Sequence, residues 1–327
     1  MAAHDQNWAP GQGLEVDTDS DSALGDETQS TTTSIAESIY AYRMEHGRSY
    51  HAYKDGSYIF PNDDQETDRL DLQHHLFNIT FDDKLFFAPI GDNPRHCLDI
   101  GTGTGIWAVD MADAYPECQV VGTDLSPSQP TFVPPNLRFI IDDAEDEWLF
   151  DQKFDLIHAR VMSGCFKDWR TVLRYAFEAL APGGYFEIQD YVIPCNCEDD
   201  TLKGTNLELW GNTMVEAANK MGRPMDQTRF FKEWMEEIGY VDIEERSFVF
   251  PTNPWPKDKK LKEIGRWNEI NITDGLQGFS LALFTRVLGW TKEEVEVHCA
   301  RVRNDMHNRA IHAYFLIPVI WGRKPPV

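Results

Sequence analysis

The sequence predicts an α/β protein built on a doubly wound parallel sheet. Three observations point to it: short apolar runs alternate with amphipathic segments, glycines follow the first run, and acids follow the first three. Expected strands cover residues 95–100, 119–123, 137–141, 154–158 and 185–190, with helices over 106–114 and 169–180. Strands separated by helices at this spacing form a parallel sheet that binds ligands beyond its carboxyl ends.

The first expected strand leads into three glycines at alternate positions, Gly101, Gly103 and Gly105, and then into a helix. Glycine is needed where a backbone turns sharply and approaches a ligand closely. This unit is therefore a candidate cradle for a nucleotide-like cofactor. Its G-x-G-x-G spacing differs from the dinucleotide fingerprint G-x-G-x-x-G, and no Gly-Lys-Ser/Thr follows as in a P-loop.

Acidic residues stand at the ends of the first three strands. Asp99 lies two residues before the first glycine, where a carboxylate would repel a pyrophosphate but suits the ammonium group of a methionine. Asp124 is placed to accept hydrogen bonds from ribose hydroxyls. Asp143 and Ala144, after the third strand, could meet an adenine amino group. Three such strand ends fit S-adenosylmethionine better than NAD or ATP.

With these residues in view, the chain resembles the seven-strand S-adenosylmethionine-dependent methyltransferases over residues 98–112 and 122–127. More narrowly, it is similar to the fungal LaeA-like methyltransferases from about Tyr40 to Pro325. The motifs are Glu45-His46-Gly47-Arg48-Ser49-Tyr50-His51, Asp68-Arg69-Leu70-Asp71, Gly103-Thr104-Gly105-Ile106-Trp107-Ala108, residues 126–130 and Gly322-Arg323-Lys324-Pro325. The chain departs from that family at His46, where Asn is expected.

The resemblance implies a Rossmann-like methyltransferase sheet of seven strands, the last one antiparallel, with helical insertions as a substrate cap. S-adenosyl-L-methionine is the cofactor it implies. The cofactor-binding residues expected from the strand ends, the loop and the resemblance are Asp99, Gly101, Thr102, Gly103, Gly105, Asp124, Leu125, Asp143, Ala144 and Tyr50.

Four segments are expected along the chain. Residues 1–33 contain seven acids and no Lys or Arg, and should stay disordered, either as a solvated leader or as a modified or partner-binding tail. Residues 34–90 form an N-terminal arm with helices over 34–53 and 68–77, and the first helix either packs on the sheet or closes over the cofactor through Arg48 and Tyr50.

The cofactor-binding core is expected over residues 91–194, followed by cap insertions and the final strands over 195–327. Helices are predicted at 205–221, 227–238, 258–270 and 291–310, and strands at 240–250 and 313–321. Thr291 and Glu294 have the spacing of a capping box. Trp210, Met214 and Phe279 are among the cap residues that either fill its core or line a pocket.

Composition disfavours several classes of function. A net charge of −24 with no basic block argues against direct binding of nucleic acid. No N-terminal apolar segment or stretch of 18 apolar residues indicates secretion or a membrane span. Six cysteines without a C-x-x-C pair indicate reduced thiols in an intracellular protein, cytoplasmic or nuclear. The adjacent His74 and His75 make a poor metal pair, so no metal is expected.

His158 and Arg160, at the end of the fourth strand, are the best placed catalytic candidates. His158 either acts as a general base or hydrogen-bonds within the sheet–helix layer. Arg160 either holds a carboxylate of substrate or cofactor, or pairs with a surface acid. The tetrad Asn/Asp-Pro-Pro-Tyr of dedicated N-methyltransferases is absent after this strand, where residues 159–162 stand instead.

Two functions from different classes fit these features. One is an enzyme that methylates a small-molecule acceptor of fungal secondary metabolism by in-line methyl transfer. The other, implied by the resemblance, is a regulatory protein that binds partner proteins and controls secondary-metabolite genes. An NAD-dependent oxidoreductase is disfavoured by the glycine spacing and by Asp99.

Overall fold

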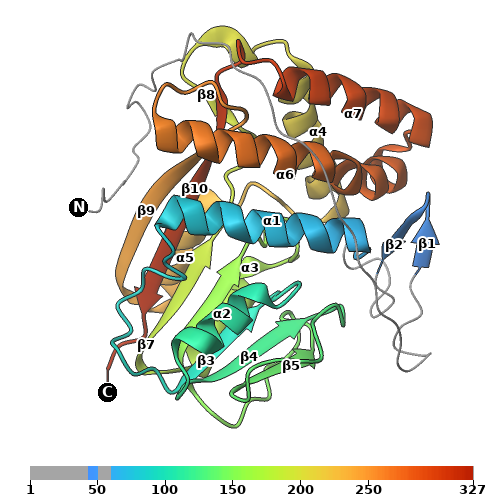
Figure 1. Ribbon diagram of the computed structural model, residues 1–327. Coiled ribbons are helices and arrows are strands. Elements are labelled where there is room, and N and C mark those ends of the chain that lie inside the picture. Colours follow the sequence, from blue (N-terminus) through green and yellow to red (C-terminus); the bar gives the residue numbers. More distant parts are fainter. Residues whose placement is uncertain (1–42, 51–59, 327) are drawn as a thin grey trace.

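The computed structural model describes residues 43–50 and 60–326, which form an α/β fold around one large sheet (Figure 1). Five strands run parallel in the order β5, β4, β3, β6 and β7, and β10 lies antiparallel between β7 and β9. Their bounds are β3 His96–Ile100, β4 Gln119–Asp124, β5 Leu137–Ile141, β6 Phe154–Arg160, β7 Leu180–Gln189, β9 Val241–Pro251 and β10 Ala313–Arg323. The predicted sheet and its antiparallel last strand are confirmed.

The sheet contains one strand more than predicted. The two-residue strand β8 (Asn196–Cys197) pairs with Ala313 and Tyr314 at the start of β10. A strand of two residues is too short to show a period-2 pattern, so it could not be predicted. The predicted acidic tail, residues 1–33, lies outside the described residues.

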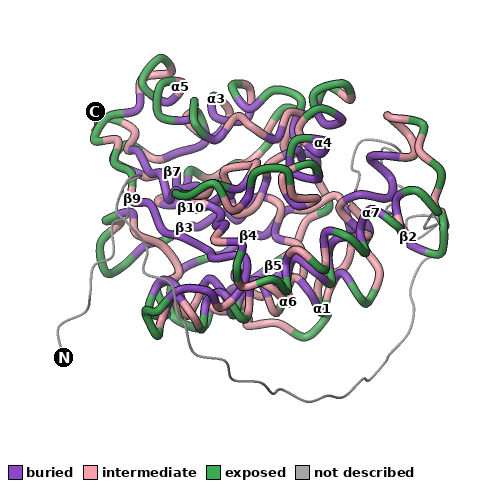
Figure 2. The backbone as a smooth tube through the Cα atoms, turned by 90° about the horizontal axis from the view of Figure 1, so that it is seen from above, coloured by how far each residue is buried: buried purple, intermediate pink, exposed green. Residues whose placement is uncertain are grey.

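Helices cover both faces of the sheet, and the sheet separates two apolar clusters. One cluster lies against α1 (Asp64–Phe81), α2 (Ile106–Ala114) and the cap helices, whereas the other lies against α3 (Trp169–Ala179) and α5 (Phe231–Ile238). Figure 2 shows β3, β4, β7 and β10 buried in the interior, with exposed residues on the outer helices. The period-2 alternation of the strands divides their side chains between these clusters.

The cap consists of α4 (Asn206–Met221), α6 (Lys259–Leu283), which continues into the π-helical turn η3 (Phe284–Leu288), and α7 (Lys292–Met306), grouped at the top of Figure 1. Short 3-10 turns, η1 (Asp200–Leu202) and η2 (Thr228–Phe230), precede α4 and α5. The capping box of Thr291 and Glu294 is present as predicted. Helix α6 extends 13 residues beyond its predicted end because Gly275 and Gly278 pack tightly instead of breaking it.

The prediction of one helix over residues 34–53 is wrong for residues 43–50, and the remainder lies outside the described part. These residues form a hairpin, β1 (Arg43–Glu45) and β2 (Arg48–Tyr50). The turn residues His46 and Gly47 have φ angles of 54° and 90°. Two positive φ angles define the type I′ turn that favours Asn-Gly, which explains why Asn is expected where His46 stands.

No helix in the described ranges is both long and apolar enough to cross a membrane.

Candidate active site

The glycine loop joins β3 to α2 in the conformation that only glycine adopts freely. Gly101, Gly103 and Gly105 have φ angles of 65°, 58° and 81°. A Cβ atom on Gly101 would collide with Met162, and one on Gly105 with the ring of Phe139. At Gly103 the nearest atom would be 3.5 Å away, so space is left open on the side of the loop that faces the pocket.

Asp124, at the end of β4, fixes this loop and faces the same pocket. Its Oδ2 accepts a hydrogen bond from the Gly103 amide at 2.8 Å, and its Oδ1 accepts one from the Ser126 amide at 2.9 Å. Burial raises the pKa of Asp124 to about 6, against the lowering effect of these amides. A carboxylate has about four acceptor sites, so further hydrogen bonds to a ligand remain possible.

Asp99 lies buried at the end of β3 and is held by two donors. Its Oδ2 accepts from the Thr102 hydroxyl at 2.6 Å, and its Oδ1 lies 2.7 Å from His158 Nδ1. The imidazole of His158 is fully buried and stacks on Trp107, with ring centroids 3.7 Å apart and an interplanar angle of 3°. Burial lowers the pKa of His158, although Asp99 raises it, so the neutral ring donates from Nδ1 to the carboxylate.

Arg160, at the end of β6, is a part-buried cation on the same pocket wall. Its Nη2 donates to His74 Nδ1 at 2.9 Å, and its guanidinium lies 4.9 Å from the ring centroid of Phe77. Because an arginine can only donate, His74 Nδ1 is unprotonated, and Nε2 therefore donates to Asp110 Oδ2 at 2.9 Å. Burial lowers the pKa of Arg160 to about 10, which leaves it charged at neutral pH.

Most of the predicted residues line one pocket, with an empty volume of about 1050 Å³ including its mouth. They are Asp99, Gly101, Thr102, Gly103, Asp124, Leu125, Asp143, Ala144, His158 and Arg160. Gly105 shapes the loop from behind, at the start of α2. Tyr50 is not among the lining residues. Its ring is buried in the hairpin under the guanidinium of Arg286, at 4.9 Å, and burial raises its pKa to about 12.

Several residues that line this pocket were not predicted from the sequence. Leu70 and Gln73 of α1 reach the pocket, and Arg223, just after α4, approaches from the cap. Arg223 donates to the Cys165 carbonyl and to Glu145 Oε2, the latter at 3.3 Å. The helix α1 was predicted, and the polar side chains of Gln73 and His74 interrupt its apolar face. That interruption is the signal in the sequence that could have marked Gln73 as a lining residue.

Comparisons with known proteins identify the family of the chain. A family model described as a methyltransferase domain matches residues 72–245. Methyltransferase pytC of Aspergillus terreus is 42% identical, over 97% of this chain and 97% of that protein. The secondary metabolism regulator laeA of Aspergillus fumigatus is 36% identical, over 93% and 82%. The protein-methionine methyltransferase laeA of Emericella nidulans is 34% identical, over 87% and 77%.

The chain therefore belongs to the methyltransferase domain family and is an enzyme of the methyltransferase class. Within that family it is one of the fungal LaeA-like methyltransferases, as its motifs predicted.

Proposed function

We propose that this enzyme transfers a methyl group from S-adenosylmethionine to a small-molecule acceptor of fungal secondary metabolism. The observation that carries the proposal is the pocket itself, where the open side of Gly103 and three strand-end acids face one cavity. Its relatives named as methyltransferase pytC and as laeA support the link to methylation and to secondary metabolism.

The residues present fit this cofactor group by group. Asp124 would accept hydrogen bonds from the ribose hydroxyls, and Asp143 with Ala144 would meet the adenine. Asp99 would face the ammonium group and Arg160 the carboxylate of the methionine moiety. Bound there, S-adenosylmethionine supplies the electrophilic methyl group, while the protein aligns the acceptor and excludes water.

We propose that His158 positions Asp99 and is not the general base of the reaction. A base must reach the proton that it removes. Although His158 adjoins the pocket, its ring is fully buried and stacked on Trp107. Its Nδ1 is engaged by Asp99, and Nε2, the nitrogen that would act as the base, is buried as well. This corresponds to the second of the two roles expected from the sequence, hydrogen bonding within the sheet–helix layer.

The proposal is tested by supplying methyl-labelled S-adenosylmethionine and the purified enzyme to an extract of a strain that lacks this gene. We expect one labelled low-molecular-weight product that a Gly103→Asp variant does not form. Label that appears only on protein, or no label with a cofactor-binding enzyme, would contradict a small-molecule acceptor.

A regulatory methyltransferase-fold protein is the second candidate, favoured by the 36% identity to the regulator laeA over most of the chain. The name of the Emericella nidulans relative, a protein-methionine methyltransferase, supports a protein as the acceptor in that case. Affinity purification of the full chain from its own fungus distinguishes the two. A stoichiometric protein partner, together with altered transcription of metabolite genes on deletion, would favour the regulator.

A further inference from the structure

A second pocket adjoins the cofactor pocket and shares Leu70, Gln73 and Val161 with it. It lies between α1, the end of β7 and the cap helices α4 and α6, and its empty volume is about 750 Å³ including its mouth. A cavity of this size suits a small organic molecule.

The walls of this second pocket are mainly aromatic and apolar. They include Phe60, Tyr191, Trp210, Met214, Phe279 and Phe315. The indole nitrogen of Trp210 donates to Ser280 Oγ at 2.9 Å, and the Tyr191 hydroxyl accepts from Asn271 Nδ2 at 3.4 Å. Since these polar atoms are already bonded, the rings offer the pocket their apolar faces.

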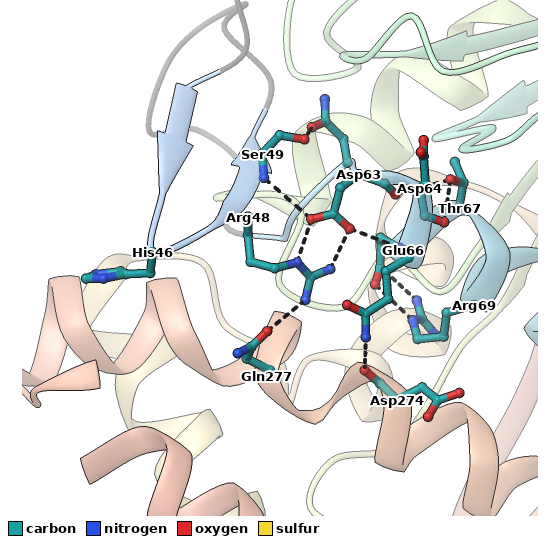
Figure 3. A network of polar contacts seen from close by, with 12 residues as sticks. His46, Arg48, Ser49, Asp63, Asp64, Glu66, Thr67, Arg69, Asp274 and Gln277 are labelled. Atoms are coloured by element: carbon teal, nitrogen blue, oxygen red, sulfur yellow. Dashed lines mark hydrogen bonds and ion pairs between the residues drawn. The ribbon is translucent and has the colours of Figure 1, made fainter. Parts of the chain in front are cut away.

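Two of the charged groups on this pocket, Glu66 and Arg69, neutralise one another. Arg69 binds both oxygens of Glu66, at 2.6 and 3.1 Å, and donates to Asn271 Oδ1 at 2.6 Å. Figure 3 shows the Arg69 guanidinium turned toward Glu66, beside the separate Arg48–Asp63 pair. In a buried bidentate pair the two opposite charges neutralise each other, so the pair does not select a charged ligand.

The boundary between the two pockets is built from strained backbone. Val161 has a φ of 56°, which a β-branched residue rarely adopts. The next amide, Met162 N, donates to Asp190 Oδ2 at 3.1 Å, and Tyr191 N donates to Asp190 Oδ1 at 2.7 Å. Strain of this kind persists where the surroundings impose it, and it gathers at functional sites.

We infer that the second pocket is the acceptor subsite and that it takes an uncharged, flat, mainly apolar molecule whose nucleophile meets the cofactor pocket at Gln73 and Val161. This inference rests on the proposed function. The aromatic walls supply stacking surface for a ring system, and the closed Glu66–Arg69 pair disfavours a cationic amine. Burial also raises the pKa of Asp190 to about 7, which reduces negative charge at that wall.

The test measures binding of the uncharged aromatic probe N-phenyl-1-naphthylamine by fluorescence, with S-adenosylhomocysteine binding measured in the same samples by calorimetry. We expect saturable probe binding that Trp210→Ala weakens at least tenfold. The matched control is Trp234→Ala, on α5 at the opposite face and outside both pockets. Met214→Trp, which fills the pocket instead of emptying it, should abolish probe binding. Both pocket variants should bind S-adenosylhomocysteine as the wild type does.

Equal probe affinity in wild type, Trp210→Ala and Met214→Trp, with intact S-adenosylhomocysteine binding, would overturn the inference and leave the proposed function standing. Probe binding without S-adenosylhomocysteine binding would instead remove the proposed function. Stronger binding of the cation benzyltrimethylammonium than of the neutral probe would overturn the uncharged class of acceptor.

Discussion

Gly103 carries the largest functional consequence at the scale of a single residue. Its amide donates to Asp124, its carbonyl accepts from Gln129 Nε2 at 2.7 Å, and its missing side chain leaves room facing the pocket. We expect Gly103→Asp to reduce S-adenosylhomocysteine affinity at least a hundredfold in calorimetry, because a carboxylate would occupy the cofactor space.

The matched control is Gly183→Asp, which introduces the same side chain at a φ of 82° with nothing within 4 Å. Both substitutions carry a left-handed backbone cost of roughly 1–2 kcal/mol. Their melting temperatures should therefore fall by similar amounts, and the control should bind S-adenosylhomocysteine normally. Wild-type affinity in Gly103→Asp would remove the glycine loop from the site.

We expect Asp124 to make cofactor affinity depend on pH. The ionised carboxylate has more acceptor capacity for ribose hydroxyls than the protonated acid. Because burial raises the pKa of Asp124 to about 6 in the free protein, acidification below that pH protonates it. We expect the dissociation constant of S-adenosylhomocysteine to be constant above pH 7 and to rise about tenfold per pH unit well below pH 6.

Asp124→Asn isolates this effect from the titration of other groups on the pocket, including His158. The variant should bind more weakly at pH 8 and should lose the part of the slope that Asp124 causes. Equal slopes between pH 7 and 5 in the variant and the wild type would show that another group is responsible.

Substitutions of His158 distinguish a role in positioning Asp99 from a role in proton transfer. If it orients Asp99, His158→Leu should weaken S-adenosylhomocysteine binding roughly tenfold or more, because a hydrogen bond to a charged group contributes about 1.5–3 kcal/mol. His158→Asn retains an N–H donor for Asp99. Its affinity for S-adenosylhomocysteine should therefore stay within about threefold of the wild-type value, because this hydrogen bond is not lost. Wild-type affinity in both variants would restore the general-base role, since a base acts on turnover and not on cofactor binding.

At the level of the elements, ion pairs and hydrogen bonds attach the β1–β2 hairpin to the rest of the protein. Arg48, buried, donates to both oxygens of Asp63, at 2.5 and 2.7 Å, as Figure 3 shows, and Arg286 pairs with Glu45. Ser49 and Asn62 continue the chain of hydrogen bonds to Ser126, beside Asp124. The hairpin is thereby tied to the loop after β4, which lines the pocket.

Arg48→Met should destabilise the protein by about 2–4 kcal/mol, because it leaves the part-buried Asp63 carboxylate unpaired. Burial raises the pKa of Asp63, but the bonds and charge of Arg48 outweigh this and lower it. A lowered folded-state pKa contributes stability above the unfolded pKa, near 4, and loses it on further acidification. The difference in the free energy of unfolding between the wild type and the variant, measured in urea, should therefore be largest at neutral pH and decrease below pH 4.

Arg170→Met is the matched control, since the Arg170–Glu237 pair is half exposed on both sides. Exposed pairs contribute about 0–1 kcal/mol, so this variant should unfold almost as the wild type does. Equal destabilisation by the two substitutions would show that the hairpin pair adds nothing beyond surface charge.

At the scale of the whole molecule, the sheet was predictable because each core strand is an apolar run closed by a turn signal or an acid. The residues at strand ends followed directly, and ten predicted side chains or glycines line one pocket. The hairpin was not predictable, since His46-Gly47 replaces the usual Asn-Gly turn signal and each strand has three residues.

Contacts between distant segments were also beyond reach of the sequence. The line from Arg160 through His74 to Asp110 joins β6, α1 and α2, and the second pocket joins α1 to the cap. The residues in these contacts are far apart in the sequence, and no sequence pattern links them. They become visible only when the packing of α1 across the sheet is known.

The proposed function depends first on whether the pocket at the strand ends binds S-adenosylmethionine. The most direct measurement is isothermal titration of the wild-type protein with S-adenosylmethionine and S-adenosylhomocysteine, supported by thermal shift, because a ligand of the native state stabilises it. We expect one site per chain for both compounds, a rise of several degrees in melting temperature, and loss of both effects in Gly103→Asp. No heat and no thermal shift from a folded protein with either compound would contradict the proposed function.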